Sequence, residues 1–272
     1  MTDSISQPLR GRTAVVAGGG SRGDGVGNGR AAAILLARQG ARVGVLDVVP
    51  EWAQTTADMI AAEGGEAVAL GVDVTDDDSV RAGIDRVVRK FSEPAILVNN
   101  VGISGPTGTA EELDLDEWDR ALRINVTSMM LTVRHVVPYM RAAGDGSIVN
   151  NASVFGMVGG HHALLYPTSK AAVIGMTRAM AAHYGRDGVR VNCVAPGSVY
   201  TPMVSTRGMS EELREDRRQQ GVLEIEGTGW DVGHAIAYLA GPAARWVTGV
   251  VLPVDAGLTS GKMRWIHGAT AS

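Results

Sequence analysis

Short apolar runs alternate along the chain with longer segments of mixed polarity. The runs are rich in valine and show no in/out alternation, which is typical of buried strands. The predicted strands are residues 13–17, 42–46, 66–70, 95–98, 146–151, 189–194 and 250–254. The segments between them are predicted to be helices, over residues 29–39, 51–63, 76–91, 116–141, 166–185 and 231–240.

Strands that alternate with helices indicate a parallel sheet with helices on both faces. We therefore predict an α/β protein with a Rossmann-like, doubly wound parallel sheet of about seven strands. No repeat or composition break divides the chain, so residues 1–272 are predicted to form one domain.

Two segments stand outside this pattern. Residues 204–229 are charged and follow a predicted strand. They are interpreted either as a solvated helical insertion or as a loop covering a substrate site, and the second is favoured because open α/β sheets bind ligands at the carboxyl ends of their strands. Residues 259–272 are predicted to be a C-terminal tail, either frayed or reaching a neighbouring subunit.

Composition and charge exclude several classes of protein. The 25 basic and 29 acidic residues give a net charge of −4, and no Lys/Arg run offers a nucleic-acid surface. No segment approaches the ~18 unbroken apolar residues that span a bilayer, so we expect a cytoplasmic protein with no membrane contact. The single cysteine, Cys193, excludes an internal disulfide, and no metal site is expected.

Glycine is the unusual residue, with 36 in the chain, and many lie where an apolar run ends. The segment AGGGSRGDGVGNGRA, residues 17–31, separates the first predicted strand from the first helix. Such glycines let the backbone approach a pyrophosphate, whose charge the free N–H groups of the helix start then bind. Asp47, at the end of the second predicted strand, could accept both hydroxyls of an adenosine ribose and would repel a 2′-phosphate. A tight turn, or the nucleotide site of an S-adenosylmethionine methyltransferase, also fits these residues.

Tyr166 and Lys170 lie four residues apart at the start of a predicted helix, and therefore on one helix face. An adjacent ammonium favours the phenolate, so the pKa of Tyr166 is predicted to lie below its usual value of about 10, which would suit a proton acceptor. A methyltransferase has no use for this pair, whereas a solvated helix face would need no chemistry at all.

With these residues the chain resembles the short-chain dehydrogenases/reductases, specifically their compact single-domain branch, over almost its whole length. The matching motifs, in order, are Gly18, Gly27 and Gly29; Asp73-Val74; Asn99-Asn100-Val101-Gly102; Asn125; Ser153, thirteen residues before Tyr166; Tyr166 with Lys170; and Pro196-Gly197 with Thr201.

The resemblance implies an NAD-dependent oxidoreductase that interconverts a secondary alcohol and a ketone. Tyr166 would be the general acid/base, Lys170 would lower its pKa, Ser153 would orient the substrate oxygen and Asn125 would hold a water. The implied cofactor-binding residues are Gly18, Gly27, Asn28, Gly29, Asp47, Asp73, Val74, Asn99, Gly102, Tyr166, Lys170, Pro196, Gly197, Val199 and Thr201. A nucleotide-binding regulatory member without catalysis is the alternative.

The glycine loop departs from the family pattern. Five extra residues lie between Gly18 and Gly29, and Asn28 stands where the family usually has isoleucine. Arg22 could reach a 2′-phosphate, but the carboxylate of Asp47 argues for NAD over NADP.

The substrate is predicted to be a small alcohol or ketone of a class that the sequence leaves open, with Phe155, Met157 and the segment 160–164 as pocket walls. The resemblance also implies a homotetramer, in which the helices around 116–141 and 166–185 pack across a two-fold axis.

Overall fold

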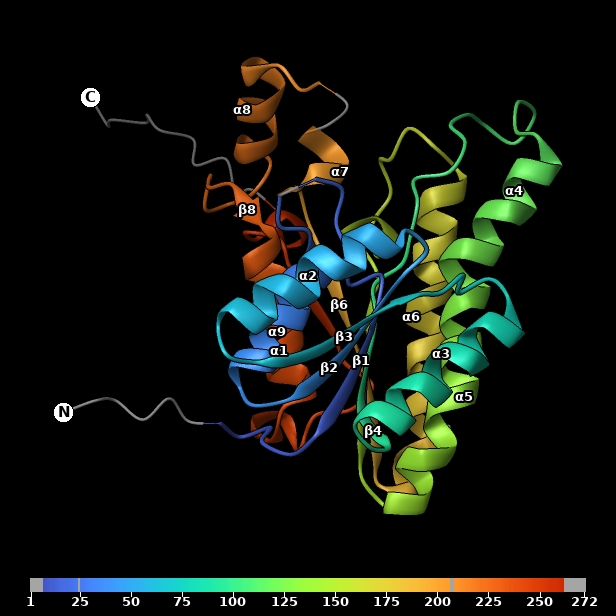
Figure 1. Ribbon diagram of the computed structural model, residues 1–272. Coiled ribbons are helices and arrows are strands. Elements are labelled where there is room, and N and C mark those ends of the chain that lie inside the picture. The colour runs from blue at the N-terminus through green and yellow to red at the C-terminus, as the bar shows by residue number, and fades with distance from the viewer. Residues whose placement is uncertain (1–6, 24, 206–207, 262–272) are drawn as a thin grey trace, which may run out of the picture.

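The computed structural model describes residues 7–23, 25–205 and 208–261. Its centre is a seven-stranded sheet in the order β3-β2-β1-β4-β5-β6-β9, in which all neighbours are parallel (Figure 1). The predicted doubly wound fold and its seven strands are confirmed. The strands are β1 Thr13–Ala17, β2 Arg42–Asp47, β3 Glu66–Gly71, β4 Pro94–Asn99, β5 Gly146–Asn151, β6 Val189–Pro196 and β9 Val251–Val254.

Helices cover both faces of this sheet (Figure 1). One apolar core joins the sheet to α1, α2 and α9, and a second joins it to α3, α5 and α6. The helices are α1 Asn28–Arg38, α2 Pro50–Ala62, α3 Asp77–Lys90, α4 Leu115–Leu122, α5 Ser128–Ala143, α6 Leu165–Tyr184, α7 Pro202–Ser205, α8 Glu211–Gln219 and α9 Gly229–Ala240. No helix in the described part of the chain is both long and apolar enough to cross a membrane.

Small residues let the helices of this core approach closely. In α1, Ala31, Ala32 and Ala33 are fully buried. A Cβ atom on Gly233 of α9 would lie only 2.8 Å from the Cβ of Ala31. Any larger residue at position 233 would therefore force α9 and α1 apart. The abundance of alanine and glycine in the sequence is therefore a packing requirement here.

The single helix predicted over 116–141 is wrong in one respect. The chain forms α4, then a π-helical turn over Arg123–Thr127, and then α5. A π-turn inserts one extra residue into the helical repeat and is frequent at functional sites. Here it carries Asn125, one of the residues singled out by the sequence.

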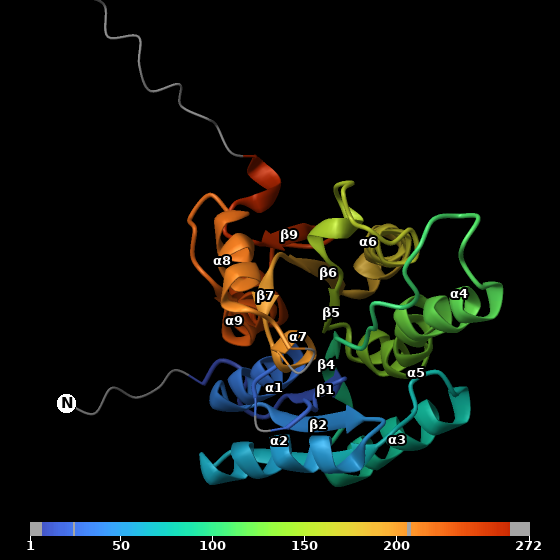
Figure 2. The ribbon, with the colours of Figure 1, turned by 90° about the horizontal axis from the view of Figure 1, so that it is seen from above.

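The charged segment 204–229 contains the helix α8 and is anchored near its end by strand β8. Strand β8, Gly227–Thr228, pairs with β7, Val199–Tyr200, in a separate two-stranded sheet. The charges pair with one another: the Arg214 guanidinium binds the Glu226 carboxylate. We call residues 202–229 the cover segment. In Figure 2, α7 lies beside α1, and α8 lies farther from α1 than α7 does. Residues 262–272, most of the predicted tail, lie outside the described residues.

Candidate active site

The residues singled out by the sequence gather at the carboxyl ends of the strands. Strand order reverses between β1 and β4, since β2 and β3 extend the sheet from one side of this pair and β5, β6 and β9 from the other. Open α/β sheets bind ligands at such a switch point, outside the carboxyl ends of the strands. The glycine loop follows β1, Gly102 follows β4, Ser153 follows β5 and Gly197 follows β6.

Lys170 lies in the second turn of α6 and is 4% exposed. Its Nζ donates to the main-chain oxygen of Asn151, at 3.0 Å, and lies 5.7 Å from the ring centroid of Tyr166. Burial lowers the pKa of the Lys170 ammonium to about 8, because a buried charge loses its hydration. This lysine therefore titrates close to neutral pH.

Tyr166 opens the same helix, and its hydroxyl is hydrogen-bonded to Ser153. Burial raises the pKa of Tyr166 above its usual 10.0, and the bond to Ser153 opposes that rise only in part. The predicted lowering of this pKa by Lys170 is therefore wrong for the protein without ligands. Desolvation of the phenolate is the largest cause, because a buried charge loses its hydration.

Asn125 is fully buried in the π-turn. Its Oδ1 accepts from the Ile103 N–H at 2.8 Å, and its Nδ2 donates to the Ile103 carbonyl at 2.9 Å and to Ser169 Oγ at 3.0 Å. This side chain ties the loop after β4 to α6. The structure thus brings Asn125, Ser153, Tyr166 and Lys170 to one place.

Gly102 leaves room for this cluster. A Cβ atom there would lie 3.1 Å from Lys170 Nζ and 3.6 Å from Asn125 Oδ1. Any side chain at this position would push on the buried ammonium, which explains why the loop after β4 carries glycine here.

The glycine loop meets the N-terminus of α1. Gly18 has a φ of +75°, and a Cβ atom on Gly29 would overlap the Gly18 carbonyl oxygen, so both positions require glycine. Gly27 caps α1, which begins at Asn28. The Oδ1 atom of Asn28 is buried without a hydrogen-bond partner among the described residues. A donor-rich ligand group or an ordered water would satisfy it.

Asp47 lies against this loop. Its two carboxylate oxygens accept from the N–H groups of Gly20 and Val49, each at 3.1 Å. Burial raises the pKa of Asp47, and those two backbone donors oppose the rise. The guanidinium of Arg22 lies 5.7 Å from the ring centroid of Trp52, whose Cβ approaches Gly20. Asp47 therefore stabilises the loop through these two hydrogen bonds. It also lies at the carboxyl end of β2, where a ligand of the sheet would bind.

Two of the other predicted cofactor residues have side chains engaged within the protein. Asn99 is 1% exposed, donates to Asn150 at 2.9 Å and accepts from Thr132 at 2.6 Å. Asp73 accepts from the N–H and the hydroxyl of Thr75, at 2.8 and 2.7 Å. Asn99 belongs to the scaffold beneath the site, and only its backbone is available to a ligand. Val74, beside Asp73, is buried.

The segment from Pro196 to Thr201 leads from β6 to the cover segment. A Cβ atom on Gly197 would lie 2.7 Å from the Cβ of Asp255, just after β9, so this crossing also needs glycine. Val199 is buried in β7, and its carbonyl accepts from Arg217 of α8 at 3.2 Å. The Thr201 carbonyl accepts from the Val204 N–H at the start of α7.

Comparison with known proteins agrees with this geometry. A family model described as enoyl-(acyl carrier protein) reductase matches residues 24–259. An uncharacterized short-chain type dehydrogenase/reductase of Sinorhizobium fredii is 37% identical over 92% of this chain and 98% of its own length. The chain belongs to the short-chain dehydrogenase/reductase (SDR) family.

Two further members of the SDR family are close to the chain in sequence or structure. The cis-4-hydroxycyclohexanecarboxylate dehydrogenase of Sinomonas cyclohexanicum is 39% identical over 92% of this chain and 97% of that protein. A 7α-hydroxysteroid dehydrogenase, solved in complex with NADH and 7-oxo glycochenodeoxycholic acid, superposes with a TM-score of 0.86 at 31% identity, over 94% of this chain and 98% of that one.

The sequence indicated no role for the side chains that connect the two halves of this SDR site, and it did not single out Asn151. Asn100 Nδ2 donates to the Gly18 carbonyl at 2.8 Å, and Asn151 Nδ2 donates to Asn100 Oδ1 at 2.7 Å. Since the Asn151 carbonyl accepts from Lys170, a hydrogen-bonded path runs from the glycine loop to α6. The signal in the sequence was an Asn-Asn pair at the end of each of two neighbouring strands, Asn99-Asn100 and Asn150-Asn151.

Aromatic side chains gather beside Tyr166. The ring centroid of His161 lies 5.3 Å from that of Tyr166, 4.7 Å from that of Phe155 and 4.4 Å from that of His162. His161 Nδ1 accepts from the Ala163 N–H at 3.1 Å, and burial lowers the pKa of its imidazole. No group of three or more His, Cys, Asp or Glu side chains among the described residues could hold a metal ion.

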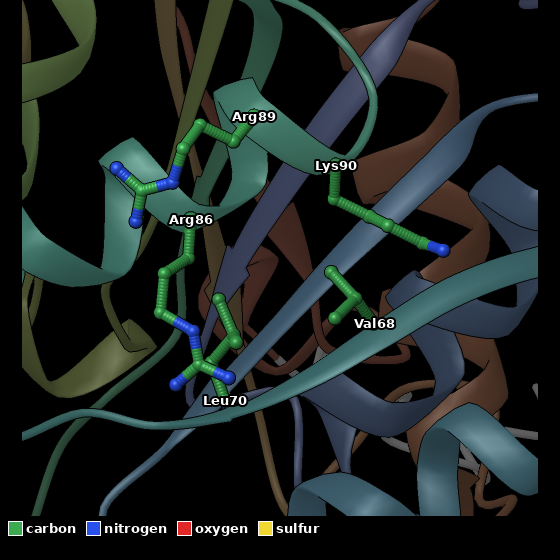
Figure 3. Close-up of a pocket in the computed structure, with 5 residues that line it drawn as sticks. All are labelled: Val68, Leu70, Arg86, Arg89 and Lys90. Carbon is green, nitrogen blue, oxygen red and sulfur yellow. The ribbon is translucent and has the colours of Figure 1, made fainter.

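A separate surface hollow lies between β3 and α3, away from this site. It is lined by Val68, Leu70, Arg86, Arg89 and Lys90. Figure 3 shows the charged ends of the three basic side chains pointing in different directions, so they do not converge on one ligand. None of the predicted site residues lines it.

Proposed function

We propose that this SDR is an NAD-dependent oxidoreductase that interconverts a secondary alcohol and a ketone, with Tyr166 as the general acid/base. The observation that carries the proposal is the buried cluster in which the Tyr166 hydroxyl bonds Ser153 and Lys170 lies beside the Tyr166 ring. A regulatory protein without catalysis would have no need to bury an ammonium at this place.

Each residue of this cluster has its own proposed role in proton transfer. Tyr166 would give a proton to the substrate oxygen in reduction and take one in oxidation, and Ser153 would hold that oxygen with a hydrogen bond. Lys170, fixed by the Asn151 carbonyl, places its Nζ 5.7 Å from the centroid of the Tyr166 ring. Asn125 holds the loop after β4 against α6. A nicotinamide dinucleotide, when bound, supplies the hydride or accepts it.

The glycine loop fits such a dinucleotide. Gly18 has a φ of +75°, and the absence of a Cβ on Gly29 lets the loop pass against the N-terminus of α1, whose free N–H groups suit an anion. We propose that Gly18, Gly27, Asn28 and Gly29 border the diphosphate and that Asp47 accepts the ribose hydroxyls. The remaining cofactor contacts would come from Asp73, Val74, the Asn99 backbone, Gly102, Tyr166, Lys170, Pro196, Gly197, Val199 and Thr201.

We propose NAD rather than NADP because a carboxylate at the ribose repels a 2′-phosphate. Arg22, the basic residue of this loop, already lies over Trp52. Saturation curves with the two cofactors test this part of the proposal. A several-fold preference for NADP would contradict the role given to Asp47.

Cyclic secondary alcohols are the substrate class that we propose to test first. The names of two relatives describe a hydroxycyclohexanecarboxylate and a hydroxysteroid dehydrogenase. The aromatic wall of Phe155 and His161 would suit an apolar ring. The experiment is a panel of cyclic and acyclic alcohols with NAD, followed by the absorbance of NADH. No turnover of any secondary alcohol or ketone would contradict the proposed activity.

We also propose that residues 1–272 act as one domain in a cytoplasmic homotetramer, with residues 204–229 over the substrate site. The exposed face of α6 carries Ala171, Ala172, Gly175 and Ala179, which would let a second helix approach closely.

A further inference from the structure

Arg30 is the largest fully buried side chain of the described residues, and it lies directly under the glycine loop. It is the third residue of α1. Its Nη2 donates to the Ser21 carbonyl at 3.0 Å, and its Nη1 donates to the carbonyls of Gly23 and Gly25, at 2.9 and 2.6 Å. The guanidinium is therefore the centre around which the extended part of the loop is wrapped.

Thr56 of α2 extends this arrangement by one step. Its hydroxyl accepts from Arg30 Nε at 3.0 Å and donates to the Gly19 carbonyl at 2.9 Å. Every second carbonyl of the loop, at residues 19, 21, 23 and 25, is thus directed at Arg30 or Thr56.

The direction of these carbonyls decides the direction of the amides. In a trans peptide the N–H of the next residue points opposite to the carbonyl. The Gly20 N–H accordingly points away from Arg30 and donates to Asp47. The N–H groups of Arg22 and Val26 follow the Ser21 and Gly25 carbonyls, and no hydrogen bond joins them to another described residue.

The loop is also held from its other side. A Cβ atom on Gly25 would overlap the ring of Pro202, the first residue of α7, and a Cβ on Gly229 of α9 would approach the Val26 carbonyl. The loop is confined between the guanidinium and the cover segment, so its shape depends on the hydrogen bonds that Arg30 makes.

We propose that Arg30 is a positioning residue for the cofactor diphosphate. By binding the loop carbonyls, it turns the amides of Arg22 and Val26 outward as donors for phosphate oxygens, beside the N-terminus of α1. A guanidinium suits this task because it spreads five N–H groups over three nitrogens in a rigid planar fork, whereas an ammonium has only three, all on one nitrogen. The inference rests on the proposed function, since it assigns a role within the proposed nucleotide site.

The first test compares ADP with adenosine, because they differ by the diphosphate alone. Both are titrated by calorimetry into the full-length chain, its Arg30→Met variant and its Arg30→Lys variant. Arg30→Met should weaken ADP binding about tenfold or more and adenosine binding less than about twofold, and Arg30→Lys should lie between it and the wild type. Equal losses for the two ligands, or no loss for ADP, would overturn the proposal.

Arg190→Met is the matched control. Arg190 also donates to four main-chain carbonyls, those of Leu239, Ala240, Gly241 and Val247. It lies at the start of β6, at the amino-terminal ends of the strands, whereas the glycine loop lies at their carboxyl ends. This variant should lower the unfolding temperature and leave the ratio of ADP to adenosine affinity unchanged. A change in that ratio as large as that of Arg30→Met would overturn the specific role of Arg30.

The second test needs no variant and so does not depend on folding of the Arg30 variants. Amide hydrogen exchange of the wild-type loop, residues 20–27, should slow with saturating ADP and stay unchanged with adenosine. An unchanged exchange rate with ADP bound would overturn the proposal while leaving the proposed activity standing. A wild-type chain that binds neither ADP nor NAD would refute the proposed function, and the inference with it.

Discussion

Lys170 donates from its Nζ to the main-chain oxygen of Asn151, 3.0 Å away, and thereby joins α6 to the end of β5. The side chain of the same Asn151 binds Asn100, which in turn binds the Gly18 carbonyl. The ammonium beside Tyr166 and the first turn of the glycine loop are therefore positioned relative to one another by a single hydrogen-bonded path. Such a path would hold the two ends of a bound dinucleotide in register.

Replacement of Tyr166 by phenylalanine should abolish turnover. The variant loses the hydroxyl that exchanges the proton and keeps the ring that packs beside Lys170 and His161. We expect a fall in kcat of at least about 100-fold and a change in NAD affinity below about threefold. NADH absorbance measures the first and calorimetry the second. Retention of most of the activity would contradict the proposed mechanism.

The buried ammonium of Lys170 should make stability rise with pH just above neutrality. Its pKa is about 8 in the folded chain and 10.5 as the ordinary value, so between these pH values the unfolded state binds more protons. Stability then increases with pH, by at most about 1.4 kcal/mol per unit. Burial also raises the pKa values of Cys193 and Tyr166, which acts in the opposite direction as the pH approaches their ordinary values of 9.0 and 10.0.

Urea unfolding of the ligand-free protein at pH 7.5 and pH 9 measures this effect. The difference in unfolding free energy between the wild type and Lys170→Met isolates the contribution of the lysine, because the variant keeps the other titrating groups. Lys170→Met should be the more stable of the two at pH 7.5, by a margin that shrinks at pH 9. An unchanged margin would mean that the lysine is not desolvated as the structure indicates.

Asn125→Ala should reduce stability as well as activity. The substitution leaves the N–H and the carbonyl of the half-buried Ile103 without their side-chain partner, which should cost about 1–3 kcal/mol in total. Urea unfolding tests this expectation, with Tyr166→Phe as the comparison that should unfold near the wild type. Wild-type stability of Asn125→Ala would show that water replaces these hydrogen bonds.

Gly29→Ala should prevent cofactor binding. The added Cβ would overlap the Gly18 carbonyl oxygen, so either α1 or the loop must move. Gly64→Ala is the matched control, because Gly64 has a φ of +79° but open space around its Cβ position. The control should cost about 1 kcal/mol of stability from the left-handed backbone and bind NAD normally. Calorimetric titration with NAD separates the two variants.

Gly175→Arg should dissociate the proposed tetramer. The arginine would stand on the exposed small-residue face of α6, where the Cβ of this position meets nothing within 4 Å in the isolated chain. Static light scattering should give a tetramer mass for the wild type and a lower mass for the variant. A wild-type mass of one chain, 28.4 kDa, would refute the tetramer.

The sequence by itself determined the class of fold and which residues are candidates for the site. Apolar runs located all seven strands of the large sheet to within about two residues, because a strand buried on both faces needs a continuous apolar run. The spacing of Tyr166 and Lys170 placed them on one helix face, since four residues make about one helical turn.

Only the tertiary structure decided the burial and the hydrogen-bond partners of those residues. The pKa of Tyr166 rises because burial, which no spacing reveals, outweighs the hydrogen bond to Ser153. The side chain of Asn99 proves to be scaffold because Thr132 and Asn150, distant in sequence, surround it. Arg30 is buried beneath the loop because four hydrogen-bond acceptors, three in the loop and one in α2, converge on its guanidinium. Local pattern encodes periodicity and chemistry, whereas desolvation and long-range hydrogen bonds arise only when distant segments meet.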